Sequence, residues 1–168
     1  MRHAVTIERA GDWPPAEAVG AVTLDYDMRQ RRRIRLECGS AGPVLLDLER
    51  PVGLRPGDGL RLEEGGWIAV EAAPEELIEI AAQDAAHLLR IAWHLGNRHC
   101  PAEIVDTRIY VRRDHVIEQM ARGLGATVTQ VLRPFHPEGG AYEAVRPDHE
   151  HDHGHEHDHE HDHGHDHG

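Results

Sequence analysis

The first half of the chain alternates between apolar and polar residues in short segments, as strands do when they bury one face of a sheet. Turns rich in Gly and Pro separate these segments, most clearly at residues 39–43 and 56–59. The alternating segments are residues 21–28, 33–38, 44–48, 60–62 and 67–70. About five or six strands at this spacing predict a small β-sandwich or barrel, which we assign to residues 1–73.

From residue 74 onward, helical spacing appears between the strand-like segments. A first helix is predicted over residues 85–95, capped by Asp84, and a second helix follows the cap Asp114. Their apolar faces are residues 85, 88, 89, 91, 92 and 95 in the first helix and 116, 117, 120, 121 and 124 in the second. Strands are predicted at residues 77–81, 102–107, 108–113 and 126–132. The resulting β-α-β-β-α-β order is that of a ferredoxin-like fold, assigned to residues 74–147, so the chain is predicted to be α+β.

Three residues with reactive side chains receive a structural interpretation. Cys38 shares a predicted strand face with Ile34 and Leu36, so we expect a core thiol. His87 and His94 lie seven positions apart on one side of the first helix. A helical metal pair needs closer spacing, so we expect both to belong to a solvated face.

Residues 148–168 have a different composition from the rest of the chain. They contain only His, Asp, Glu and Gly, with ten of the chain's 16 His residues and eight of its 30 acidic residues. A segment without apolar residues cannot bury enough surface to offset its chain entropy, so we expect it to be disordered in the absence of metal. Imidazole and carboxylate ligands suit Ni(II), Zn(II), Cu(II) and Co(II). The candidate ligands of this tail are His149, His151, His153, His155, His157, His159, His161, His163, His165 and His167.

The net charge of −12 is largely a property of the tail, because the remaining residues hold 22 acids against 18 bases. Five Arg residues among residues 29–35 could suggest nucleic acid, but the strand alternation and the acidic body favour an exposed strand or a partner-binding edge. The sequence predicts no signal peptide and no membrane span. We therefore expect a cytoplasmic protein with reduced thiols that binds neither nucleic acid nor membrane.

A second candidate metal site lies at the end of the first predicted helix. The loop Gly-Asn-Arg-His-Cys-Pro over residues 96–101 presents His99 between a Gly and a Pro. Cys100 is a further candidate ligand, although we favour simple packing for its thiol. His115 opens the second helix and is a third candidate; taken alone, it and His99 could equally be exposed residues without function.

These motifs together resemble the family of urease accessory nickel chaperones. The resemblance rests on Gly96, Asn97, Arg98, His99 and Pro101, followed by Asp114, His115 and Val116 and the His-rich end. It extends to the Arg-x-Arg-x-Arg pattern of residues 31–35 and to the Pro-Gly-Asp-x-Leu pattern of residues 56–60, and so covers nearly the whole chain.

The resemblance implies a homodimer joined through its C-terminal domains, with one metal ion held between His99 and the same residue of the partner. His115 matches a peripheral His that binds metal in some relatives, but those relatives have a His where this chain has Arg113. The resemblance further implies an N-terminal domain that docks a partner. The expected activity is delivery of Ni(II) to apo-urease together with a urease accessory GTPase.

Two alternatives remain at the level of sequence. A cytoplasmic buffer or storage protein for nickel, zinc or copper would account for the tail equally well. A metalloenzyme using His99, Cys100 and His115 is disfavoured, since we find no general base, nucleophile or phosphate-binding loop beside them. We therefore expect no enzymatic activity.

Overall fold

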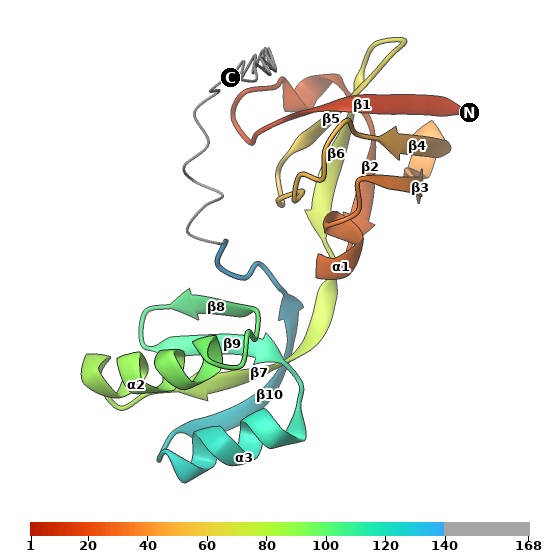
Figure 1. Cartoon of the computed structure of the whole chain (residues 1–168). Helices are drawn as coiled ribbons and strands as arrows, with labels where there is room; N and C mark the ends of the chain where they lie inside the picture. Colours follow the sequence, from red (N-terminus) through yellow and green to blue (C-terminus); the bar gives the residue numbers. More distant parts are fainter. Residues whose placement is uncertain (140–168) are drawn as a thin grey trace, which may run out of the picture. The chain divides into compact units, whose positions relative to one another are not determined.

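The computed structural model describes residues 1–139 and shows an α+β protein built on two sheets (Figure 1). Residues 1–138 form one compact unit that contains both sheets. The predicted His-rich tail and its ten candidate ligands lie outside the described residues. No helix in residues 1–139 is long and apolar enough to cross a membrane.

The first sheet has six strands in the order β2-β6-β5-β1-β4-β3. The strands are β1 (Arg2–Glu8), β2 (Ala18–Leu24), β3 (Arg33–Glu37), β4 (Pro43–Asp47), β5 (Gly59–Leu62) and β6 (Trp67–Ala72). The short helices between them are η1 (Pro15–Glu17), α1 (Tyr26–Arg29) and η2 (Gly39–Ala41). The sheet is mixed, because β1 is parallel to β4 and β2 is parallel to β6, whereas the other pairs are antiparallel.

Of the two predicted forms, a sandwich or a barrel, the sandwich is wrong, since these strands form one sheet rather than two. Both end strands contribute to a single core, β2 through Val22 and Leu24 and β3 through Leu36. The sheet therefore curves into a half-barrel. The two end strands are not bonded to each other; instead η2 lies against β2, where the Ser40 hydroxyl donates to the Val19 carbonyl at 3.0 Å.

The predicted strand over residues 21–28 is too long. It stops at Leu24 because the Asp25 carboxylate accepts a hydrogen bond of 2.7 Å from the Met28 N–H and caps α1. Met28 is 44% exposed rather than part of the core. Strand β1 was not predicted individually, although it lies inside the sheet between β5 and β4.

The second sheet has four antiparallel strands in the order β10-β7-β9-β8. Along the chain its elements are β7 (Pro74–Ala81), α2 (Ala85–Gly96), β8 (Ala102–Val105), β9 (Arg108–Arg112), α3 (His115–Gly123) and β10 (Thr127–Pro134). Two predicted helix caps are confirmed: Asp84 accepts from the His87 N–H, and Asp114 accepts from the Val116 and Ile117 N–H groups.

Both helices pack on one face of this sheet, against Ile78, Ile80, Ile109 and Val111. Three residues predicted to face inward do not: Ala85 of α2 is exposed, Leu89 of α2 is 70% exposed, and Val116 of α3 is 53% exposed. The reason is geometric. The buried positions of α2 are residues 87, 91 and 95, a row that leaves position 89 on the opposite side.

The segment after β10 contacts both the second sheet and helix α1. Phe135 is fully buried with Leu77 and Tyr110, and Tyr26 of α1 packs against it. The Arg29 guanidinium, also fully buried, donates to the Phe135 carbonyl. Its Nε and Nη1 lack hydrogen-bond partners, and burial lowers the pKa of this group.

Candidate metal site

The candidate site begins where α2 ends, and the backbone there has an unusual conformation. The His99 N–H donates to the Gly96 carbonyl at 3.0 Å, and the Cys100 N–H donates to the Leu95 carbonyl at 3.3 Å. This pattern ends many helices and places one residue in the left-handed region, normally a glycine. Here that residue is His99, with φ of 53°.

A left-handed conformation costs a non-glycine residue free energy, on the order of 1–3 kcal/mol where the residue is strongly held. A glycine, Gly96, occurs three residues earlier in the sequence, yet the left-handed position of this turn is taken by His99. Its side chain is exposed. An exposed imidazole on a strained turn is a feature that folding alone does not require, which makes it a functional candidate.

The outward side of α2 next to this loop is apolar. Leu89 and Trp93, one turn apart, are 70% and 66% exposed. The Trp93 ring lies edge-on to His94, with 5.0 Å between ring centroids. Arg98 donates to the His94 carbonyl at 2.9 Å, which holds its guanidinium along the helix end.

Cys100 is half-buried and packs against the core beneath α2. Burial raises the pKa of its thiol, and the nearby Asp114 carboxylate raises it further. The contacts of Cys100 with the core beneath α2 agree with the packing role that we favour from the sequence. Cys38 is fully buried, as predicted for a core thiol, and burial raises its pKa to about 11.

His115 is the first residue of α3 and is exposed. The adjacent Asp114 carboxylate is occupied by the Ile117 and Val116 N–H groups, which lower its pKa. Asp114 thus caps α3 through one carboxylate oxygen, Oδ1. Within residues 1–139, no three His, Cys, Asp or Glu side chains gather closely enough to hold an ion. Within this part of the chain, His99 and His115 are both exposed and neither belongs to such a group of three.

The prediction for His87 is wrong. This side chain is only 8% exposed, and its Nδ1 accepts the Gln83 N–H at 3.1 Å. Its Nε2 lies 2.8 Å from the Leu124 carbonyl, which can only accept, so the ring proton sits on Nε2. The ring ties the start of α2 to the end of α3. The i, i+4 row of His87, Ile91 and Leu95 was the signal that could have revealed this.

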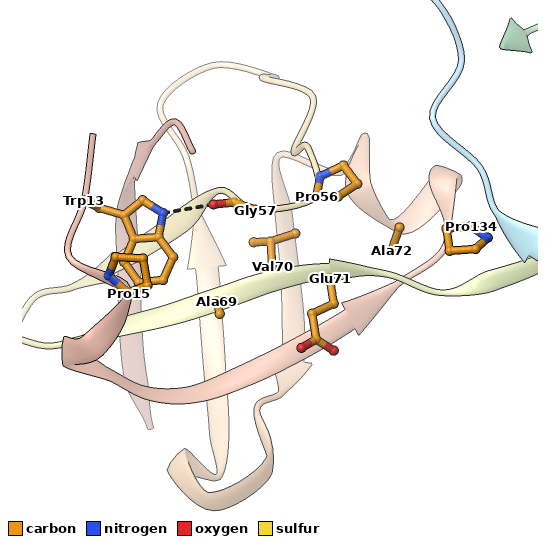
Figure 2. A pocket seen from close by; sticks show the side chains of 9 residues that line it. All are labelled: Trp13, Pro15, Pro56, Gly57, Ala69, Val70, Glu71, Ala72 and Pro134. Atoms are coloured by element: carbon orange, nitrogen blue, oxygen red, sulfur yellow. Dashed lines mark hydrogen bonds between the residues drawn. The ribbon is translucent and has the colours of Figure 1, made fainter. Parts of the chain in front are cut away.

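A cavity of about 490 Å³ lies elsewhere, beside β6 (Figure 2). Trp13, Pro15 and Pro56 form its apolar walls, and Glu71 is its one acidic lining residue. The Trp13 indole N–H is already bonded to the Gly57 carbonyl at 2.9 Å. No His or Cys lines this cavity, so its walls offer apolar contact rather than metal ligands.

The described residues define an α+β protein that presents imidazoles at its surface, among them His99 and His115. Models of the UreE urease accessory protein match it twice, the N-terminal domain at residues 3–73 and the C-terminal domain at residues 75–167. The chain belongs to the UreE urease accessory protein family.

Relatives named urease accessory protein UreE support this assignment. One from Bradyrhizobium sp. (strain ORS 278) is 53% identical over 83% of this chain and 65% of its own length. One from Rhodopseudomonas palustris (strain BisB18) is 48% identical over 90% of this chain and 72% of its own. One from Chelativorans sp. (strain BNC1) is 51% identical, with 80% and 85% covered. These names describe a protein accessory to an enzyme, not the enzyme itself.

Proposed function

We propose that this chain is a nickel metallochaperone that binds Ni(II) and delivers it to apo-urease during maturation of the urease active site. The observation that carries the proposal is His99, an exposed imidazole held in a left-handed conformation at the end of α2. Membership of the family supports the link to urease. The nickel ion is cargo here, so binding must be tight enough to capture it and open enough to release it.

A homodimer would place His99 beside the same residue of a second chain. Leu89 and Trp93 support this arrangement, because exposed apolar side chains next to the loop favour burial against a partner. If the ion lies on the two-fold axis of the dimer, each chain contributes one imidazole, that of His99, to the same ion. Such a two-ligand site keeps coordination positions free for other donors. Cys100 remains only a minor candidate for one of them.

The predicted tail would serve as a second, high-capacity ligand set. The Glu138 N–H donates to the Ala102 carbonyl at 2.8 Å, so the last described residues run beside β8, close in sequence to His99. His149 follows Gly139 by ten positions, and a chain of that length reaches at most about 33–36 Å when fully extended. Tail imidazoles could therefore meet an ion at His99. Zn(II), Cu(II) and Co(II) should bind the same ligands in vitro.

We further propose three functional parts. Residues 1–73 would form a domain that docks protein partners, namely apo-urease and a urease accessory GTPase. Residues 74–147 would form a ferredoxin-like domain for dimerisation and metal binding, an assignment that the strand order β10-β7-β9-β8 supports. Residues 148–168 would form the metal-binding tail. His115 would be a peripheral ligand, and the protein would act in the cytoplasm.

Metal titration tests this proposal. Nickel binding would be measured by calorimetry for the full chain, for a chain ending at Pro147, and for that shorter chain carrying His99→Asn. Asn tolerates the left-handed conformation, so this substitution removes the imidazole with little backbone change. We expect the shorter chain to keep about one tight ion per dimer and the Asn variant to lose it. His115→Asn is the matched control and should keep the tight ion.

Equal tight binding by the shorter chain with and without His99→Asn would overturn the assignment of His99. A storage protein remains the second candidate, favoured by the ten His of the tail. Urease activation in cells separates the two functions. If the chain ending at Pro147 still activates urease, storage in the tail is not the essential role.

A further inference from the structure

The edges of the two sheets differ in how well they are protected. An unpaired edge offers N–H and C=O groups to any other strand, and proteins usually block it with charge, short length or a covering segment. Three of the four edges in residues 1–139 are blocked in this way. β3 carries exposed charges at Arg33, Arg35 and Glu37, and η2 lies against β2.

The edge formed by β8 is both short and covered. This strand has four residues, and the segment that ends at Glu138 runs beside it. The Glu138 N–H donates to the Ala102 carbonyl at 2.8 Å, and the Glu138 carboxylate accepts from the Ile104 N–H at 3.3 Å. Little of the β8 backbone is left for another chain.

The edge of β10 has none of these protections in the described part of the chain. β10 is eight residues long and pairs with β7 at every position from Thr127 to Pro134 without a bulge. No charged residue occurs before Arg133, and no Pro before Pro134. Leu132 is 71% exposed. A long, regular, uncharged edge with an exposed Leu is suited to pairing with another strand.

The sequence of β10 is complementary to itself in one antiparallel register. If Gln130 lies opposite its own copy, Val128 faces Leu132 on the helix-covered side of the sheet. On the other side Thr129 faces Val131, and Arg133 faces Thr127 rather than another Arg. Pairs of β-branched and apolar residues stabilise neighbouring strands, and like charges opposite each other destabilise them. Moving the axis to Val131 would instead place Gln130 opposite Leu132.

We propose that β10 pairs with β10 of a second copy of this chain, antiparallel and centred on Gln130, so that two four-stranded sheets join into one. The two-fold axis would stand perpendicular to the sheet, with the helices of both copies on the same face. β10 and β8 are at opposite ends of the sheet order, so this contact uses neither α2 nor the His99 loop. Its failure would therefore leave the proposed nickel site untouched.

Sedimentation equilibrium of the full chain, with a chelator present, tests the pairing over a wide concentration range. Gln130→Lys and Gln130→Glu each place like charges opposite each other on the axis. We expect either variant alone to lose the largest species, so that the average mass at high concentration falls about twofold. Mixing the two variants should restore it, because Lys then faces Glu. Gln119→Lys, the same substitution at an exposed position of α3, should behave as the unmodified chain.

The restored association in the mixture cannot come from misfolded variants, so it supports both the strand and its register. The proposal is overturned if the unmodified chain and Gln130→Lys sediment identically at all concentrations. It is also overturned if the mixture associates no better than the separate variants. If the β10 edge instead binds a strand of a different protein, the mixture of the two variants would associate no better than each variant alone.

Discussion

At the scale of single residues, His99 and His87 show how much the surroundings of an imidazole decide. Both lie in or just after α2, yet His99 is exposed on a strained turn and His87 is buried with both ring nitrogens bonded. The sequence predicted the exposure of His99, because Gly96 and Pro101 mark a loop. The row of His87, Ile91 and Leu95 indicated a buried face, but the Leu124 carbonyl that the His87 ring meets lies 37 residues away and could not be foreseen.

The bonds of His87 lead to a prediction about stability. His87→Ala removes a buried ring and leaves the Gln83 N–H and the Leu124 carbonyl without their partner. We expect the free energy of unfolding to fall by about 2–4 kcal/mol. Urea denaturation of the metal-free protein measures this change. His115→Ala removes an exposed imidazole from the same half of the chain and should change the value by less than about 0.5 kcal/mol. Equal midpoints for the two variants would contradict the buried position of His87.

At the scale of elements, the helices and strands of residues 74–134 were predicted well because each boundary has a local chemical signal. Asp84 and Asp114 cap helices, and Gly96 ends one. The first sheet was predicted less well, since its curvature depends on contacts such as η2 against β2 that no local pattern encodes. Alternation continued through Asp25, so α1 appeared as part of a strand. The free face of α2 was also missed, because the row that the helix buries is His87, Ile91 and Leu95, which leaves Leu89 on the opposite side.

The segment that follows β10 is an element whose attachment is testable. One Glu103 oxygen accepts the Arg133 guanidinium at 2.7 Å, and the other accepts the His136 N–H at 2.9 Å. Glu103→Ala breaks both bonds, so we expect faster amide hydrogen exchange at His136 and Glu138 and a loss of about 1–3 kcal/mol of unfolding free energy. Glu64→Ala breaks only an exposed ion pair with Arg2 and should cost less than about 1 kcal/mol. Unchanged exchange at His136 would mean that Glu103 does not hold this segment.

At the scale of the whole molecule, the proposed metal site is incomplete in one chain. Within residues 1–139, His99 does not belong to any group of three His, Cys, Asp or Glu side chains that could hold an ion. Tight binding at His99 therefore requires further ligands from another chain or from the tail. The exposed apolar side chains Leu89 and Trp93 of α2 suggest where a second chain could pack and so bring its own His99 to the ion. Assembly and nickel binding should therefore be lost together when that side is altered.

Trp93→Glu tests this coupling, because it places a charge on the exposed apolar side of α2 without touching the core beneath it. We expect the metal-free protein to lose the contact through α2, so that light scattering gives the mass of a monomer at concentrations too low for β10 pairing. The chain ending at Pro147 with the same substitution should lose its tight nickel ion, although His99 is intact, because one imidazole cannot replace a pair. Val52→Glu introduces the same charge at a residue that is 37% exposed in the first half of the chain and should leave both properties unchanged. A monomeric Trp93→Glu protein that still binds nickel tightly would show that one chain provides the complete site, and the shared His99 pair would have to be abandoned.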